Sequence, residues 1–303
     1  MHEGLVGART LVGKPYLGDE KLRAQYAAQI APRTAVMLNR VLSLHLPHLK
    51  PRRVLDLGAG TGVVGATLKS RYGESLEVTA VDRVAAPGLI AADLSRPVRP
   101  SGVLGRFDLV VAAHLLNELQ SLTPQTRSRL VMFWIKEFLN PGGRMLLIEP
   151  ALKETSRALL EVRDALVSAG VFVVAPCLTQ APCPALANPK DWCHDSAPRA
   201  SLSRADFSFL VLSQDTPPLS DPDLLRVVSD LKKEKGRQRL FGCGEAGRHA
   251  FVLQTRDVSA ANEAFLRLSR GDLCRLTGTQ QTGDGRRLNA ESHVNEAPVA
   301  QVP

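Results

Sequence analysis

The chain has 303 residues, 44% of them hydrophobic, which is enough for one substantial core of roughly 200 residues with additions. It contains no run close to the roughly 20 apolar residues of a membrane-spanning helix, and its first residues lack the apolar stretch of a signal peptide, so we expect neither a membrane protein nor a secreted one. The formal net charge of +8 favours a polyanionic partner, although proteins that bind no nucleic acid also reach this charge. We expect a monomer, in the cytoplasm rather than the mitochondrial matrix, because Glu3 and the scarcity of serine and arginine before residue 20 argue against a transit peptide.

Residues 19–49 are predicted to form helices, with a break at Pro32, so we take residues 1–50 as an N-terminal helical extension. From there on, short apolar runs alternate with helical stretches, which predicts a parallel sheet covered by helices on both faces, an α/β fold of the Rossmann-like kind. The four runs read RRVLDLGAG, LEVTAVDR, RFDLVVAAH and GGRMLLIEP. A helix follows Pro150 and is expected to end at Gly170.

The chain beyond this helix is predicted to close the sheet with two further strands, at 206–213 and 249–256, as antiparallel neighbours. The C-terminal segment is predicted to form a small β appendage, with its turn at Gly283–Gly285, followed by a loose tail. We predict a main domain over residues 51–257, with a cysteine-rich insertion at 175–200 and a basic insertion at 214–248. The C-terminal segment covers 258–303.

Three glycines alternate directly after the first predicted strand and before a helix, at Gly58, Gly60 and Gly62. Glycine lets the backbone turn sharply and approach a ligand closely, and the helix N-terminus adds partial positive charge. The same stretch also satisfies the dinucleotide fingerprint through Gly60, Gly62 and Gly65. An NAD site and a core without a ligand are therefore the alternatives to be weighed.

Three carboxylates bear on that choice and favour S-adenosylmethionine. Asp56 lies two residues before the first glycine, where it can hold an ammonium group that NAD does not have. Asp82 ends the second strand and can accept both ribose hydroxyls, a role that suits either cofactor. Asp93 ends a third strand, where methyltransferases commonly contact the adenine amine. The residues that complete the predicted cofactor site are Gly58, Ala59, Gly60, Thr61, Gly62, Arg83 and Leu94.

With these features, residues 51–257 resemble the class I methyltransferases, which implies a seven-stranded mixed sheet and methyl transfer from S-adenosylmethionine. In this fold, residues after the fourth strand usually govern the reaction. Here His114, Asn117 and Glu118 lie one helical turn apart, so Glu118 could act as a base and Asn117 could orient a substrate. Alternatively, His114 packs against the cofactor and the other two begin a helix. Neither an Asn-Pro-Pro-aromatic run nor a Pro-Cys pair is present, so the chemistry stays unassigned.

Three of the five cysteines, Cys177, Cys183 and Cys193, fall within seventeen positions. An odd number of cysteines without a signal peptide argues against a disulfide framework. Their intervals are longer than in the usual zinc pairs, which leaves zinc open but poorly matched, and small buried hydrophobic residues are a further alternative. A [4Fe-4S] cluster accepts irregular spacing, with Cys243 as a natural fourth ligand and Cys274 as a spare. For all four thiols to meet, the two insertions would have to fold toward each other.

A narrower resemblance rests on HLLNEL after the fourth strand, IEPALKETSRALLEVRDAL after the fifth, the PCPAL cysteine loop and GDLCRL. From Tyr16 to Leu276 the chain resembles the methyltransferase-like proteins of the mitochondrial small ribosomal subunit and their bacterial relatives. The resemblance implies a class I core, binding to the small ribosomal subunit or its precursor RNA during assembly, and a four-cysteine iron–sulfur cluster. By motif position, its ligands are Cys177, Cys183, Cys193 and Cys243.

The run KKEKGRQR carries five positive charges against one negative charge, which most often marks a solvated surface. Its place just before Cys243 makes it a candidate for contacts with an RNA backbone, which give strong salt dependence and little sequence choice. The residues are Lys232, Lys233, Lys235, Arg237 and Arg239. The prediction is thus a methyltransferase acting on ribosomal RNA or the small subunit. Its rivals are a non-catalytic assembly factor that keeps the cofactor site and a small-molecule methyltransferase with a zinc-stapled insertion.

Overall fold

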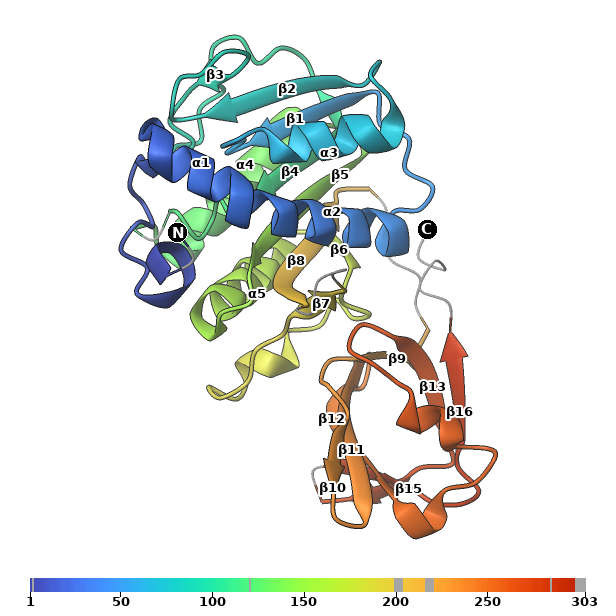
Figure 1. Ribbon diagram of the computed structural model, residues 1–303. Helices are drawn as coiled ribbons and strands as arrows, with labels where there is room; N and C mark the ends of the chain where they lie inside the picture. Colours follow the sequence, from blue (N-terminus) through green and yellow to red (C-terminus); the bar gives the residue numbers. More distant parts are fainter. Residues whose placement is uncertain (2, 120, 199–203, 216–220, 284, 298–303) are drawn as a thin grey trace.

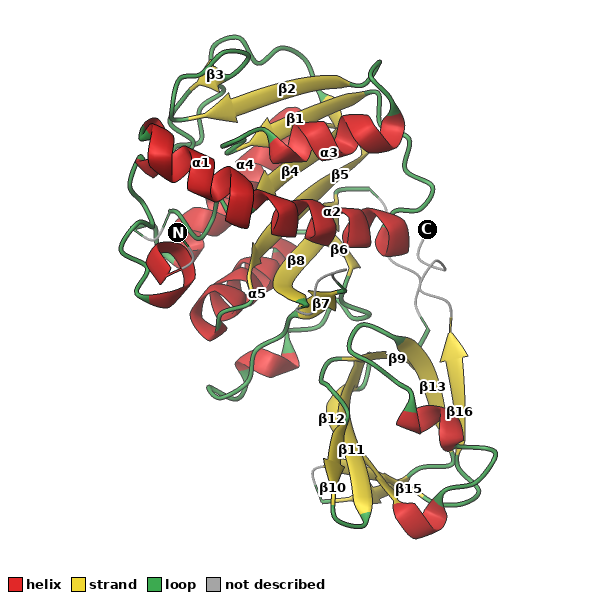
Figure 2. Cartoon of the chain, viewed as in Figure 1, coloured by secondary structure: helices red, strands yellow, loops and turns green. Residues whose placement is uncertain are grey.

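The computed structural model describes residues 1, 3–119, 121–198, 204–215, 221–283 and 285–297 (Figure 1). Residues 298–303, the end of the predicted loose tail, lie outside that range. The described chain forms two sheets, the first covered by helices on both faces and the second accompanied only by short helical turns (Figure 2). Within the same residues, we find no helix long and apolar enough to cross a membrane.

The helices and strands follow the predicted alternation up to the middle of the chain. The long helices are α1 (Glu20–Gln29), α2 (Ala31–His45), α3 (Val63–Tyr72), α4 (Pro124–Phe138) and α5 (Lys153–Ser168). The strands of the first sheet are β1 (Arg53–Leu57), β2 (Glu77–Asp82), β3 (Ile90–Ala91), β4 (Phe107–Ala113), β5 (Leu139–Pro150), β6 (Phe172–Ala175), β7 (Asp195–Ala197) and β8 (Ala205–Ser213). Those of the second are β9 (Leu224–Val227), β10 (Lys232–Glu234), β11 (Arg237–Gly244), β12 (Gly247–Gln254), β13 (Leu273–Thr277), β14 (Gln280–Thr282), β15 (Gly285–Leu288) and β16 (His293–Ala297).

The first sheet has the strand order β3-β2-β1-β4-β5-β8-β6, with β7 paired to β8 outside this path. Strands β1 to β5 pair in parallel, whereas β8 runs antiparallel to β5 and to β6. A parallel sheet that reverses only at its next-to-last strand is the class I methyltransferase arrangement, so the fold class is confirmed. The carboxyl ends of β1, β2 and β4 meet at one edge, which is where ligands bind in such sheets.

The middle stretches of β4 and β5, 109–112 and 145–148, are apolar on both sides because both faces of the sheet are covered. On β4, Val110 packs in one core with Trp134 of α4, whereas Leu109 packs in the other core with Leu42 of α2. Helices α2 and α3 thus cover one face, and α4 and α5 cover the other (Figure 1). The helix pair α1 and α2 confirms the predicted helical segment. Its break falls at Ile30, so that Pro32 lies in the first turn of α2, where a proline costs no hydrogen bond.

The second sheet has the order β14-β15-β12-β11-β9-β13-β16, with β10 paired to β11. It encloses a core of its own, in which Leu240, Phe251, Phe265 and Leu288 are almost fully buried. The turn predicted at Gly283–Gly285 joins the antiparallel strands β14 and β15.

One prediction about strand placement was wrong. The strand expected at 249–256 forms as β12, but it pairs with β11 and β15 in the second sheet, and β8 instead neighbours β5, β6 and β7. The segment predicted as a basic insertion, 214–248, supplies β9, β10 and β11 of that second sheet. Alternation of apolar and polar residues predicts a strand without saying which sheet receives it.

Candidate functional site

The glycine loop after β1 has the backbone conformation that only glycine adopts freely. Gly58, Gly60 and Gly62 have φ values of 76°, 56° and 76°. A Cβ atom at Gly58 would lie 3.1 Å from the side chain of Leu115, and one at Gly60 would lie 3.3 Å from that of Leu17. Gly62 then caps α3, whose N-terminus faces the same edge of the sheet. The loop can therefore bring its backbone close to a ligand.

A cavity opens above this loop and is lined by six of the ten predicted cofactor residues. They are Gly58, Gly60, Asp82, Arg83, Asp93 and Leu94. Asp82 shapes the cavity, because its carboxylate accepts hydrogen bonds from the amides of Gly60 at 2.8 Å and Val84 at 2.9 Å. Asp93 is exposed and accepts the amide of Ser95. The remaining four residues, Asp56, Ala59, Thr61 and Gly62, do not line the cavity.

Asp56 lies beneath the glycine loop and is only 1% exposed. Neither of its carboxylate oxygens accepts a hydrogen bond of ordinary geometry from the described residues. Burial, together with the charge of the nearby Asp82, raises the pKa of Asp56 to about 7, and the amide of Gly65 opposes this rise only in part. A buried carboxylate without a partner is costly in a folded chain, and a cation brought to this end of the cavity would relieve that cost.

An N-terminal strap, residues 9–17, covers the cavity. Its backbone is held by Glu118, which accepts the amide of Gly13 at 2.5 Å and the hydroxyl of Tyr16 at 3.2 Å. Arg83 donates to the carbonyl of Gly13 at 2.8 Å and also to that of Lys14. Gly13, Lys14, Tyr16 and further strap residues line the cavity wall. Sequence reasoning missed the strap, since nothing in these residues resembles a motif.

The three residues considered for catalysis lie at the end of β4, but the helix predicted there is a pair of overlapping turns, and α4 begins only at Pro124. The buried carboxylate of Glu149 fixes these turns by accepting the amides of Leu116 and Asn117. The side chain of Asn117 accepts a hydrogen bond from Arg9 of the strap at 3.1 Å. Asn117 and Glu118 therefore hold the strap in this structure, and Glu118 is engaged through both oxygens.

The strap's anchor gives a first prediction. Glu118→Gln is expected to raise the hydrogen-exchange rate of the Gly13 and Lys14 amides about tenfold, because it weakens one charge-assisted hydrogen bond worth about 1.5 kcal/mol. Mass spectrometry of the exchanging peptides would measure this. The matched control is Glu154→Gln, which removes an ion pair of Arg9 at a residue 65% exposed and should change the rate little. Equal rates in the two variants would show that Glu118 does not hold the strap.

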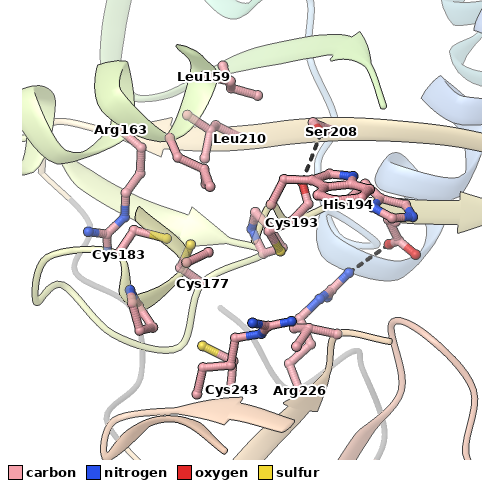
Figure 3. A pocket seen from close by; sticks show the side chains of 18 of the residues that line it. Leu159, Arg163, Cys177, Cys183, Cys193, His194, Ser208, Leu210, Arg226 and Cys243 are labelled. Atoms are coloured by element: carbon pink, nitrogen blue, oxygen red, sulfur yellow. Dashed lines mark hydrogen bonds and ion pairs between the residues drawn. The ribbon is translucent and has the colours of Figure 1, made fainter. Parts of the chain in front are cut away.

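The four predicted cysteine ligands line one cavity between the two sheets (Figure 3). Cys177, Cys183 and Cys193 lie in the loop between β6 and β7, and Cys243 approaches from β11 of the second sheet. The two segments thus do meet, although Cys243 lies on a strand of the second sheet and not in a loop of the first. Cys274 is apart from them, 1% exposed in the core of the second sheet.

Side chains of α5 hold the cysteine loop in place. Arg157 donates to the carbonyls of Ala185, Leu186, Asn188 and Asp191, and Arg163 donates to those of Thr179 and Ala181. Asp164 accepts the amide of Cys183 at 2.9 Å. The loop has little regular structure of its own, so these contacts with the helix determine where its thiols lie.

The cysteine cavity is lined by arginines as well as thiols. They are Arg163, Arg226 and Arg248, and each forms an ion pair with an aspartate, namely Asp164, Asp195 and Asp191. Burial, together with the charge of neighbouring Cys177, raises the pKa of Cys183 to about 12 and that of Cys193 to about 11. Without a bound cation these two thiols are therefore protonated at neutral pH. Among the described residues, no three His, Cys, Asp or Glu side chains are arranged to hold a single metal ion.

The predicted RNA-binding residues form the β10–β11 hairpin, but they do not share one face. Lys232 pairs across the hairpin with Arg239, and Lys233 pairs with Gln238, which points to the other face. Glu234 forms ion pairs with Arg237 at 2.6 Å and Arg239 at 3.3 Å.

One face of β11 leads from the hairpin to the cysteine cavity. Arg239, Phe241 and Cys243 occupy every second position of this strand, so their side chains lie on the same face. The guanidinium groups of Arg239 and Arg248 lie 5.7 and 4.5 Å from the centre of the Phe241 ring. Sequence reasoning missed Phe241 and Arg248, although the period of two along the strand could have indicated them.

Comparison with known proteins shows the family to which the chain belongs. The sequence model of the family described as mitochondrial small ribosomal subunit Rsm22 matches residues 21–221, about two thirds of the chain. The chain belongs to the Rsm22 family. A human relative, the ribosome assembly protein METTL17, mitochondrial, is 31% identical over 168 residues, which are 47% of this chain and 36% of that protein.

A second relative matches over a short segment. The ribosomal RNA small subunit methyltransferase C of Hahella chejuensis is 52% identical over 46 residues, 15% of this chain and 14% of that protein. The chain therefore matches well under half the length of either relative. Among solved structures, the plantazolicin methyltransferase BamL, in complex with a substrate analogue and SAH, is 11% identical with a TM-score of 0.45, over 69% of this chain and 96% of BamL.

Proposed function

We propose that this Rsm22-family protein binds S-adenosylmethionine above the glycine loop and methylates ribosomal RNA or the small ribosomal subunit during assembly. The observation that carries the proposal is the cavity lined by Gly58, Gly60, Asp82 and Asp93 in a chain of this family. The cytoplasmic location and the monomeric state expected from the sequence belong to the same proposal.

The residues of the cavity fit the cofactor. Asp82 has the position to bind the ribose hydroxyls, since each of its oxygens has a further lone pair beyond the amide that it accepts. Asp93 lies at the exposed wall for the adenine amine, and the unpartnered Asp56 would take the ammonium group. S-adenosylmethionine supplies an activated methyl group when bound. The protein's own part is to hold the cofactor and to keep water away from it under the strap.

We also propose a [4Fe-4S] cluster in the cysteine cavity, held by Cys177, Cys183, Cys193 and Cys243. The four thiols line one cavity, and their irregular spacing along the chain matches zinc pairs poorly while a cluster accepts it. The three arginines of the cavity, each already paired with an aspartate, would offset the negative charge of four thiolates only in part. The cluster would join the two sheets through protein ligands from each.

A second candidate function is a non-catalytic assembly factor that keeps the cofactor site. One observation favours it: Asn117 and Glu118, two of the three residues considered for catalysis, are engaged by the strap and not left free toward a substrate. Methylation maps of small-subunit ribosomal RNA with and without the gene separate the two candidates. The methyltransferase predicts a methyl group that disappears with the gene, and an unchanged map together with defective subunits would establish the assembly factor.

The basic hairpin gives a prediction about RNA affinity. Replacing Lys232, Lys233 and Lys235 together by alanine is expected to weaken binding to small-subunit ribosomal RNA. Each lysine that binds a phosphate should, when replaced, lower the slope of log affinity against log salt by about 1. The lysines are the choice because they are exposed, whereas Arg237 and Arg239 are already paired with Glu234.

Filter binding at several salt concentrations would measure the slopes. The matched control is Lys136→Ala on α4, which is exposed on the far side of the first sheet and should leave the slope unchanged. A triple variant with the slope of the unaltered protein would mean that the hairpin does not touch RNA.

A further inference from the structure

A second cavity adjoins the cofactor cavity and has no role in the function proposed above. Tyr16, Tyr26, His114 and Glu118 line both cavities, so the two are in direct contact. The additional walls come from α2 and from residues 150–152 after β5. A group placed there would lie next to whatever the glycine loop binds, which is the position of a methyl acceptor.

One stripe of α2 faces this second cavity. Ile30, Arg33 and Met37 line it and are spaced by three and four residues, as side chains on one face of a helix are. The half-buried side chain of Arg33 forms no ion pair or hydrogen bond within the described parts of the chain, and Arg204, another arginine of the wall, is paired with Asp206 and Asp230. Two carboxylates, Glu118 and Asp206, also line this cavity, but each is held by other groups, so Arg33 has no ion pair of its own among the described residues.

The position of Arg33 in α2 is also unfavourable for its positive charge. It lies in the first turn of α2, which has no acidic residue and no side-chain cap. A cation at a helix N-terminus is unfavourable, because the helix dipole is positive there, whereas an anion is favoured. Both observations are explained if an anionic group binds between Arg33 and this end of α2.

The rest of the wall suits a flat, partly apolar group. The rings of Tyr16 and Tyr26 lie 6.2 Å apart, and Met37 and Leu152 add apolar surface. The imidazole ring of His114 also lines the cavity and supplies polar nitrogen atoms. The Thr34 hydroxyl lies 3.4 Å from the carbonyl of Ile30 and 3.2 Å from Nε2 of His114, so Nε2 is already engaged. The Nδ1 of His114 has no partner among the described residues and is open to a hydrogen bond, as donor or acceptor according to the tautomer.

We propose that the second cavity receives one nucleotide of RNA, with its base beside Tyr16 and Tyr26 and its phosphate at Arg33. This rests on the proposed function, since it places the methyl acceptor of that function. A nucleotide unites a flat ring, a base edge with both donors and acceptors for the free Nδ1 of His114, and a phosphate for the guanidinium of Arg33. A base must leave its stack to enter such a cavity, as bases do in enzymes that act on them.

The test uses the full chain saturated with SAH, so that the cofactor cavity is filled, and titrates it with cytidine 5′-monophosphate, cytidine and ribose 5-phosphate by calorimetry. Arg33→Gln is expected to weaken binding of the monophosphate about tenfold and to leave binding of cytidine unchanged, since a hydrogen bond to a charged group is lost. Arg33→Lys should keep most of the affinity. Arg129→Gln, an exposed arginine of α4 without an ion pair in the described chain, should have no effect.

Monophosphate binding that is equal in Arg33→Gln and the unaltered protein would overturn the proposal, and so would failure of all four nucleoside monophosphates to bind at millimolar concentration. Photo-crosslinking of 4-thiouridine monophosphate provides the location, with crosslinks expected on Tyr26 or Met37 peptides and crosslinks confined to the β10–β11 hairpin contradicting it. If SAH binds and ribosomal RNA binds while no monophosphate does, this cavity assignment alone fails. If SAH itself does not bind, the proposed function fails instead.

Discussion

Cys243→Ser is expected to abolish the bound iron as completely as Cys183→Ser does. Cys243 supplies the only ligand of the proposed cluster that comes from the second sheet, and its thiol lines the same cavity as the other three. The loop that carries the other three is anchored to α5 and cannot move across to replace it. Iron content and absorption at about 400 nm of protein purified without oxygen would measure the loss.

The matched control is Cys274→Ala. Cys274 is buried in the core of the second sheet, so this variant should keep its iron while the free energy of unfolding falls by about 1 kcal/mol. Iron retained in Cys243→Ser, or lost in Cys274→Ala, would refute the ligand set. A preparation that holds zinc and shows no such absorption would refute the cluster itself.

Asp56→Asn is expected to weaken S-adenosylmethionine binding roughly 100-fold and yet to stabilise the protein. The loss corresponds to a buried charge-assisted hydrogen bond of about 3 kcal/mol. The gain arises because Asp56 is buried without a hydrogen bond of ordinary geometry in the described chain. At pH 8 we expect the free energy of unfolding to rise by about 1–3 kcal/mol, since asparagine carries no charge but must still bury its amide. Calorimetry and urea unfolding would measure the two effects.

The effect of Asp56 on stability has a defined pH range. Its pKa is raised from 3.8 to about 7 in the folded protein, so folding favours the protonated acid. Stability from this group is complete below pH 3.8 and is lost as the pH rises through 7. The advantage of Asp56→Asn should therefore shrink as the pH falls from 7 toward 4. Cofactor binding in the unaltered protein should strengthen as the pH rises through 7, because an ammonium group pairs with the ionised carboxylate.

The control for Asp56 is Asp108→Asn. Asp108 accepts the amides of Arg52 and Arg53 and the side chain of Asn140, and these hydrogen bonds help hold its pKa below the ordinary value. Its replacement should lower stability and leave cofactor binding unchanged, the opposite pattern. Cofactor affinity unchanged in Asp56→Asn would mean that this carboxylate does not contact the methionine end.

The sequence predicted the features that depend on neighbouring residues. Gly58, Gly60 and Gly62 follow a strand at fixed offsets, so the cofactor loop could be placed. The strand β12 was predicted as a strand but assigned to the wrong sheet, because its pairing with β15 joins distant parts of the chain. The strap was missed for the same reason, since Gly13 meets Glu118 across 105 positions. For the cysteines, the residue type alone indicated the candidate site. The sequence did not predict that Cys243 would lie on a strand of the second sheet.

The division of the four thiols between two sheets has a consequence for the order of events during synthesis. Cys193 leaves the ribosome fifty residues before Cys243 does. At synthesis rates of 5–20 residues per second, the growing chain therefore carries three thiols without the fourth for about 3–10 s. Even then, Cys243 reaches the cavity only when β11 has paired with β9 and β12. The proposed four-thiol centre could thus be completed only after β11 is in place, and until then the chain carries three of its thiols without the fourth.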